Sequence, residues 1–304
     1  MMNRIVIFDG NHLAYRAYYK FGNLKTIDGE RTGVIYGMPY VAESLIRKLG
    51  PDKVAVVFDG GRHKSRIKIL PEYKRRDPKL GFDRDDFYRQ KDIGLEIFKA
   101  LGLRVAWKKG FEADDIIAQI TRRYYSKGWE VVIVSADKDF HQLLRPFNEN
   151  EDGGGPVMMY NVSKGKMIDE YTLRLIYKYK PNQCVDFLCL TGDKSDNISG
   201  YPGIGEKRAL KFLDEFGSIK NFLKDDGLIF GKMDKQKLKK VYRRNRKLID
   251  LKYFYRNYLI KESIHWVNLG LFDEVNLREI CNKYEINTFL KSQFINTFKN
   301  LQSE

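Results

Sequence analysis

Five short segments of this chain carry acidic side chains that could bind metal ions together. The acidic residues are Asp9, Asp59, Glu112, Asp114, Asp115, Asp137, Asp139, Asp193 and Asp196. Carboxylate oxygens without His or Cys partners favour Mg²⁺ or Mn²⁺ over zinc. Two such ions about 4 Å apart can activate a water molecule and stabilise the leaving oxygen of an in-line displacement at phosphorus. The residue types therefore indicate a two-metal site for phosphodiester hydrolysis.

Each acidic segment taken alone also has an ordinary structural explanation. Asp114 and Asp115 open a predicted helix, where negative charge favours the helix dipole, and Asp196 lies in a turn-like sequence. Nine carboxylates in one crevice, however, would repel one another and raise one another's pKa values. Divalent cations would remove that repulsion, and we therefore favour the metal interpretation.

Short apolar runs predict the strands that position these acidic residues. The runs cover residues 5–8, 54–58 and 131–134, and they come shortly before Asp9, Asp59 and Asp137. Amphipathic segments over residues 36–49 and 113–125 alternate with them. The alternation predicts an α/β fold with a doubly wound, mostly parallel sheet. In such a sheet the carboxyl ends of the strands meet at one crevice, so we expect the acidic residues to converge there.

The second half of the chain has a different pattern. A glycine run at residues 153–155 is followed by a further predicted strand at residues 157–160, and from about residue 168 the pattern is mainly helical. We therefore predict an α/β nuclease domain over residues 1–167 and a helical C-terminal region over residues 168–304.

The charge of the chain favours a polyanionic partner. Lys and Arg number 55 against 40 Asp and Glu, which gives a net charge of +15 and a pI near 9.5. Residues 62–91 hold eleven basic and five acidic residues, a net of +6, and residues 232–261 hold twelve and two, a net of +10. Each run could be a solvated helix face, but a basic chain of this kind is typical of proteins that bind nucleic acid.

No segment of the sequence predicts a secretion signal or a membrane span. The apolar run near the amino terminus is only about four residues long, and none elsewhere approaches about 18 residues. Cys184, Cys189 and Cys281 are odd in number and lack a CxxC spacing, which argues against a disulfide framework. We expect a cytoplasmic protein without membrane contact.

Seven motifs in order resemble the 5′ nuclease family, which comprises the flap endonucleases and the 5′-3′ exonuclease domain of bacterial DNA polymerase I. They are FDGN, VFDGG, PEYK, FEADD, SADKD, GDKSDNI and GYPGIGEKRA, and they span roughly residues 4–225. The compact length and the basic stretch after the glycine motif are most similar to the stand-alone bacteriophage enzymes, some of which are named ribonuclease H. The resemblance implies a PIN-like fold and, for a phage-encoded chain, a location in the host cytoplasm.

The resemblance also implies roles for the candidate site residues. Asp9, Asp59, Glu112 and Asp114 would lie nearer a first metal, and Asp115, Asp137, Asp139, Asp193 and Asp196 nearer a second. Both metals would be Mg²⁺, which Mn²⁺ can replace. Lys74 and Arg16 match catalytic cations of the family, and Tyr73 matches its YK pair and could stack on a base.

Two further elements would hold the substrate. A basic helical arch over about residues 62–92 would admit a 5′ single strand, with Arg75 or Arg76 in place of an arginine that the family often carries at the position of Asp77. A helix-loop-helix over about residues 184–217 would hold duplex DNA backbone, helped by K⁺. Its implied contacts are Gly200, Gly203, Gly205, Lys207 and Arg208. Such contacts read the shape of DNA and carry no base code.

The combined interpretation is a Mg²⁺-dependent, structure-specific 5′ nuclease for primer or flap removal in replication. Its substrates would be 5′-flap, forked or nicked DNA and RNA-DNA hybrids, and it would act as a monomer beside replication proteins such as a single-strand binding protein. A PIN-type ribonuclease for single-stranded RNA is a first alternative, although such proteins generally lack the second acidic cluster and the PGIG motif. A non-catalytic DNA-junction binder is a second, although an inactive relative should have lost some of the nine acids.

Overall fold

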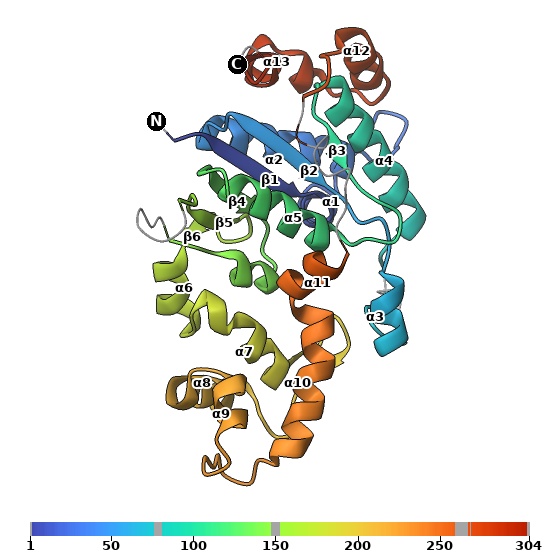
Figure 1. Ribbon diagram of the computed structural model, residues 1–304. Coiled ribbons are helices and arrows are strands. Elements are labelled where there is room, and N and C mark those ends of the chain that lie inside the picture. The colour runs from blue at the N-terminus through green and yellow to red at the C-terminus, as the bar shows by residue number, and fades with distance from the viewer. Residues whose placement is uncertain (1, 76–80, 147–152, 259–266, 268, 303–304) are drawn as a thin grey trace.

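An α/β unit lies beside a group of helices in this computed structural model, which describes residues 2–75, 81–146, 153–258, 267 and 269–302 (Figure 1). The strands are β1 (Arg4–Asp9), β2 (Lys53–Val57), β3 (Val105–Ala106), β4 (Glu130–Val134), β5 (Val157–Asn161), β6 (Lys166–Ile168), β7 (Gly192–Asp193) and β8 (Ile198–Ser199). The α-helices of the α/β unit are α1 (Gly10–Lys20), α2 (Gly33–Leu49), α3 (Lys64–Ile69), α4 (Arg84–Ala100) and α5 (Ala113–Tyr125).

Six strands form one sheet in the order β3-β2-β1-β4-β5-β6. The first five are parallel, and β6 pairs with β5 in the antiparallel direction. The chain order reverses at β1, so the carboxyl ends of β1 and β4 border the crevice where doubly wound sheets bind their ligands. The predicted α/β class and mostly parallel sheet are confirmed.

Both faces of the central strands are buried, as their unbroken apolar sequences require. Ile5 and Ile7 of β1 pack on the face that α5 covers, whereas Val6 and Phe8 pack on the face that α2 covers. Alternate side chains of a strand point to opposite faces, so a strand covered on both faces has no polar position. The predicted helix at residues 113–125 has the same bounds in the structure.

The helical region continues the core of the α5 face. Its helices are α6 (Glu170–Tyr177), α7 (Cys184–Thr191), α8 (Glu206–Phe216), α9 (Ile219–Lys224), α10 (Lys235–Ile249) and α11 (Leu251–Asn257), with short 3₁₀ helices η1 (Lys138–Leu143) and η2 (Pro181–Gln183) before α7. In Figure 1 α10 extends from the level of α8 and α9 to α11, which lies beneath α5. The helical region thus reaches the α/β unit through α10 and α11.

The last helices differ from the predicted single C-terminal region because they return to the α/β unit. They are α12 (Glu274–Lys283), η4 (Asn287–Leu290) and α13 (Ser292–Asn300), and they lie at the end of the molecule opposite α8 and α9 (Figure 1). Leu277, Phe289 and Phe298 are buried in the core that α2 and α4 share. The apolar periodicity of a helix near the C-terminus does not reveal which part of the protein that helix packs against, because long-range packing decides this.

No helix among the described residues is both long and apolar enough to cross a bilayer. All three cysteines are buried and unpaired.

Candidate metal centre and DNA-facing surfaces

The acidic residues are fixed by the ends of the strands and by the turns that follow them. Asp9 ends β1 and caps α1, since its carboxylate accepts from the backbone N–H of His12 at 3.0 Å and from the Ser135 hydroxyl at 2.9 Å. Asp59 follows β2 and accepts from the backbone N–H of Ala113 at 2.7 Å. Asp137 caps η1 after β4 by accepting from the backbone N–H of Asp139 at 3.0 Å. The local folds bring these carboxylates near one another, since Asp9, Asp59 and Asp137 each interact electrostatically with Asp114.

Three of the predicted ligands meet in a compact group. Carboxylate oxygens of Asp139, Asp193 and Asp196 all lie within 4.8 Å of one another. Asp139 and Asp196 are buried, and the buried Oδ1 of Asp139 has no hydrogen-bond partner among the described residues. A buried carboxylate oxygen without a donor is costly unless a cation completes it. The donor set, which is oxygen only, fits a hard divalent ion.

Asp9, Asp139 and Asp196 bind protons more tightly than ordinary aspartates. Burial, with repulsion from Asp114, raises the pKa of Asp9 from 3.8 to about 8. Burial raises the pKa of Asp196 to about 7 against the attraction of Lys74, and burial and the neighbouring Asp137 raise the pKa of Asp139 as well. The crevice therefore holds more negative charge than its protein cations neutralise, which is the electrostatic condition for binding a metal ion.

Lys74 lies between the two predicted groups of acids. Its Nζ is 2.7 Å from Glu112 Oε2, 3.3 Å from Asp114 Oδ2 and 3.5 Å from Asp196 Oδ2. Burial opposes the ionisation of Glu112, but Lys74 and Arg66 lower the pKa of this carboxyl well below its ordinary value. Lys74 is therefore charged within the crevice, as its predicted role requires.

Two left-handed turns hold Lys74 in this position. Lys74 has φ 50° and Asn197 has φ 60°, values that are uncommon for residues other than glycine. The Lys74 N–H donates to the carbonyl of Asp196 at 3.1 Å, and the Asn197 side chain donates to the carbonyls of Glu72 and Arg75 at 2.8 and 2.7 Å. The PEYK and GDKSDNI motifs therefore brace each other across the crevice.

Tyr73 does not offer a face to a base, which corrects the predicted stacking role. Its side chain is only 2% exposed, and its hydroxyl donates to Glu112 Oε2 at 2.8 Å. A buried tyrosine hydroxyl usually finds a hydrogen-bond partner, and here that partner is the Glu112 carboxylate. Tyr73 orients Glu112 in this structure.

Asp115 is paired with an arginine that the sequence interpretation counted among the exposed arch residues. Both Asp115 oxygens accept from the Arg66 guanidinium at 2.9 Å, and Arg66 is 1% exposed. The structure thus gives Asp115, predicted to lie nearer the second metal, an ion-pair partner within the protein. An arginine in a basic run carries no sequence signal of burial, so only the fold could reveal this pair.

Arg16 lies on α1 two turns beyond Asp9. Its Nε is buried and has no hydrogen-bond partner among the described residues, and its charge, after burial, lowers the pKa of His12. A buried guanidinium donor without a partner matches a site for an anionic group.

The glycine motif forms a turn before α8. Gly203 has φ 76°, which suits glycine, and open space surrounds the Cα of Gly205 at the N-cap of α8. Gly200, in contrast, packs against the carbonyl of Leu190, so an internal contact already explains its lack of a side chain. Lys207 and Arg208 are exposed, and Arg208 also donates to the Gly203 carbonyl at 2.9 Å.

The predicted arch is described only in part. Residues 64–69 form α3, Arg75 is exposed, and the start of α4 lies beyond a stretch that includes Arg76, which is outside the described residues. A second basic surface lies on α10, where Lys239, Lys240, Arg243 and Lys247 are exposed on one side of the helix.

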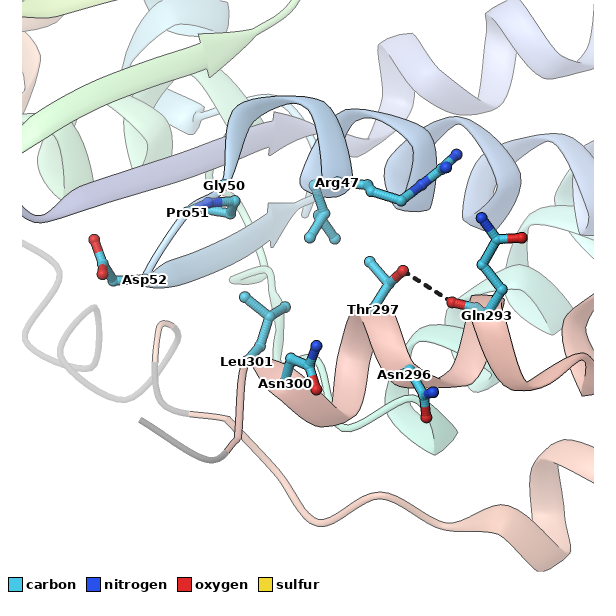
Figure 2. A pocket seen from close by; sticks show the side chains of 10 residues that line it. Arg47, Gly50, Pro51, Asp52, Gln293, Asn296, Thr297, Asn300 and Leu301 are labelled. Carbon is cyan, nitrogen blue, oxygen red and sulfur yellow. Dashed lines mark hydrogen bonds between the residues drawn. The ribbon is translucent and has the colours of Figure 1, made fainter.

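A separate polar hollow of about 480 Å³ lies between α2 and α13, and none of the nine acids lines it (Figure 2). Figure 2 shows Arg47 and Gln293 on facing helices, while Thr297 donates to a backbone carbonyl within α13. Its lining residues come from the far side of the fold and do not contribute to the acidic crevice.

Two sequence families match consecutive parts of the chain. Residues 4–178 match the 5′-3′ exonuclease N-terminal resolvase-like domain, and residues 179–257 match the 5′-3′ exonuclease C-terminal SAM fold. A 5′-3′ exonuclease of Buchnera aphidicola is 30% identical and covers 92% of both chains. One from Aquifex aeolicus is 34% identical over 74% of this chain and 73% of its own.

DNA polymerase I of Mycobacterium bovis is 34% identical over 81% of this chain, which spans only 27% of that longer protein. The fold is similar to solved structures at low sequence identity. T5 5′-exonuclease with divalent metal ions bound superimposes with a TM-score of 0.71, 20% identity and coverage of 92% of this chain and 98% of that one. A bacteriophage T5 flap endonuclease in a complex with DNA and metal ions gives 0.70, 19% identity and coverage of 99% and 100%.

Proposed function

The chain belongs to the 5′-3′ exonuclease family, and on that premise we propose that it is a Mg²⁺-dependent, structure-specific 5′ nuclease. The observation that carries the proposal is the group of acids around Lys74, in which burial and mutual repulsion raise the pKa values of Asp9 and Asp196 while Lys74 and Arg66 lower the pKa of Glu112. A purely structural ion-pair network would not leave Oδ1 of the buried Asp139 without a donor among the residues that the structure describes.

The acids divide into residues that would hold metal and residues that would position them. Asp139, Asp193 and Asp196, with Asp137 near them, would hold one ion, and Asp9, Asp59, Glu112 and Asp114 would hold the other. When bound, Mg²⁺ ions lower the pKa of water and neutralise charge on the reacting phosphate, and Mn²⁺ should substitute. Asp115 is proposed to act through Arg66.

The protein cations would bind the substrate phosphate. Lys74 is close enough to the acids to donate to the scissile phosphate, and it would stabilise the charge that develops there. Arg16, whose Nε has no partner among the described residues, would donate to the same phosphate or to its neighbour. Tyr73 would keep the Glu112 carboxylate oriented.

The duplex would lie along the helical region. Gly203, Gly205 and the first amides of α8 would approach backbone phosphates, with Lys207 and Arg208 beside them. We propose K⁺ at this turn from the family resemblance alone, so replacing K⁺ by Li⁺ should weaken duplex binding. Arg75 or Arg76 would contact the single strand at the arch.

The proposed substrates are 5′-flap, forked or nicked DNA and RNA-DNA hybrids, cut during primer or flap removal in replication. The likeness to DNA polymerase I supports that role. We also propose a monomer in the cytoplasm that works beside single-strand binding protein. The three unpaired cysteines support the reducing compartment.

One substrate comparison tests the proposal. End-labelled 5′-flap, nicked, forked and RNA-DNA substrates, with single-stranded RNA as competitor, should be incubated with and without Mg²⁺. We expect cleavage of the flap and hybrid substrates only with the metal. Cleavage confined to single-stranded RNA would favour the PIN-type ribonuclease, and binding without any cleavage would favour the junction binder.

A further inference from the structure

The junction between α10 and α11 contacts both acid-bearing segments of the crevice. Two consecutive backbone carbonyls at this junction, those of Leu248 and Ile249, accept hydrogen bonds from side chains of α3 and η1. The donors are Arg66 and Gln142, which lie far apart in the sequence. Figure 1 places this junction directly below α5.

Arg66 connects the junction to the acids of α5. Its Nε donates to the Leu248 carbonyl at 3.1 Å, while its two terminal nitrogens bind Asp115 at 2.9 Å. The same guanidinium is 3.2 Å from Glu112 Oε1 and lies 4.1 Å from the centre of the Phe254 ring of α11. Asp115 in turn completes the capping box of α5 with Glu112.

Gln142 connects the junction to the acids of η1. Its amide nitrogen donates to the Ile249 carbonyl at 3.1 Å, and its amide oxygen accepts from the Leu251 N–H at 2.9 Å. Gln142 lies in the same short helix as Asp139, whose cap is Asp137. The segment that carries these two acids is thus pinned at its far end.

Other residues of α10 and its N-cap contact the segments around the glycine turn. The Asn245 side chain, which is fully buried, donates to the carbonyls of Cys189 and Ser199 at 3.2 and 2.9 Å, and Arg244 donates to the Ser199 carbonyl at 2.7 Å. The Tyr201 hydroxyl accepts from the Asp234 N–H at 2.9 Å. One helix therefore contacts the proposed DNA-binding turn and the side chains of Arg66 and Gln142, which lie beside the two acid-bearing segments.

We infer that the α10–α11 junction sets the spacing between the α5 acids and the η1 acids, and that Arg66 and Gln142 are positioning residues for the metal centre. A guanidinium and an amide held by adjacent carbonyls fix two separate segments against one rigid element. The inference rests on the proposed function for the identity of the metal, but the positioning itself concerns only this chain.

The test uses Gln142→Leu and Arg66→Lys in the full chain. At position 142, leucine has a similar volume to glutamine but makes neither of the two hydrogen bonds of the side-chain amide. At position 66, lysine keeps a positive charge beside Asp115 but cannot bind both Asp115 oxygens and the Leu248 carbonyl at once. Binding of Mn²⁺ to the DNA-free protein is measured by electron paramagnetic resonance, and the Mg²⁺ concentration for half-maximal flap cleavage is measured separately. We expect each variant to weaken Mn²⁺ binding and raise the Mg²⁺ midpoint by about tenfold or more, the effect typical of losing support behind a metal ligand.

Gln183→Leu is the matched control. Gln183 also bridges helix ends with its side-chain amide, donating to the Leu213 and Gly217 carbonyls at 3.1 Å, but these partners carry none of the acids. The Gln183→Leu variant should lose about as much thermal stability as Gln142→Leu and should keep the wild-type affinity for Mn²⁺. Duplex affinity without divalent ions should stay within about twofold of wild type in Gln142→Leu.

Two outcomes would overturn the inference. If Gln142→Leu and Arg66→Lys lower the melting temperature but keep wild-type Mn²⁺ affinity, the bonds serve folding alone. If these variants bind duplex more weakly without divalent ions but keep wild-type Mn²⁺ affinity, the junction supports DNA binding and does not position the metal centre. A wild-type protein that binds Mn²⁺ but cuts no flap would refute the proposed function and leave the positioning test intact.

Discussion

The acidic crevice and the glycine turn differ in how firmly their side chains are held. In the crevice, Glu112 is bound by Tyr73, Lys74 and Arg66 at once. At the turn, Lys207 and Arg208 are exposed at the start of α8. The comparison suggests a division of labour, because fixed groups can stabilise a transition state without reorganising, whereas exposed cations attract phosphates of any sequence.

The largest effect is expected from removing a single charge in the crevice. Asp139→Asn keeps the volume but takes a carboxylate from the Asp139–Asp193–Asp196 group. Its Mg²⁺-dependent flap cleavage should fall by more than the roughly hundredfold typical of losing a group that only supports a metal ligand. Binding to duplex without metal should persist, as gel-shift titration would reveal.

Asp186→Asn is the matched control for that substitution. Asp186 is also a buried aspartate, but it accepts from the backbone N–H of Ile219 at 2.8 Å in the helical region. Its saturated cleavage rate should stay near wild type even if stability falls. If the Asp139→Asn protein cleaves at the wild-type rate, the assignment of Asp139 as a metal ligand is wrong.

The second-largest loss of cleavage is expected from Lys74→Ala. The charge of Lys74 lies within 3.5 Å of both groups of acids, so it is placed to act on the reacting phosphate more than on overall affinity. The single-turnover rate at saturating DNA should fall by roughly a hundredfold or more, as for one lost electrostatic contact in an active site. Affinity measured in Ca²⁺ should change much less.

Lys127→Ala provides the comparison, because it removes the same charge from an exposed lysine that follows the end of α5 opposite Asp114. It should alter affinity only slightly and leave the saturated rate unchanged. If the Lys74→Ala protein cleaves at the wild-type rate when saturated with DNA but binds DNA much more weakly, Lys74 contributes to DNA binding and not to the chemical step.

A smaller effect should appear in the pH dependence of stability. Asp9 and Asp196 have folded pKa values of about 8 and about 7, above the ordinary 3.8, so protonation favours the folded state. Their contribution is complete below pH 3.8 and is lost as pH rises through the folded values. The metal-free protein should therefore lose stability between pH 5 and pH 8.

Mg²⁺ should offset that loss, because it neutralises the ionised crevice. The gain in melting temperature on adding Mg²⁺ should be larger at pH 8 than at pH 6, by about 3 °C or more, which corresponds to roughly 1 kcal/mol in a chain of this size. KCl at matched ionic strength controls for screening. An equal gain at both pH values would count against a metal site in the crevice.

Sequence reasoning predicted the part of the fold that local pattern determines. The strand at residues 131–134 and the helix at residues 113–125 follow from apolar periodicity, and the doubly wound topology brings the strand ends together. It did not predict that α12 and α13 return to cover α2 and α4. The apolar period of a helix shows which of its own faces is buried. It does not show which of the two hydrophobic cores of the protein that face joins.

The candidate site shows the same limit. The acids could be found because strand ends and their spacing mark them, but the burial of Tyr73 and Arg66 could not. Arg66 binds a carbonyl 182 residues away, and nothing in a run of basic residues distinguishes the one that turns inward. The packing of α11, through Phe254, creates the pocket that makes its burial favourable.

The smallest effect should come from the glycine turn. Lys207→Ala removes one exposed cation, so duplex affinity should fall only severalfold and equally for all sequences. The slope of log K against log salt should flatten by about 0.9, the value for one lost phosphate contact on B-DNA. Lys207 is preferred to Arg208 because the Arg208 guanidinium also binds the Gly203 carbonyl and its loss could alter the turn. Lys283→Ala, an exposed lysine of α12 at the opposite end of the molecule, should leave the slope unchanged. If both variants gave the wild-type slope, the start of α8 would be a solvated helix face, and the contrast between a fixed crevice and a phosphate-binding turn would fail at the turn.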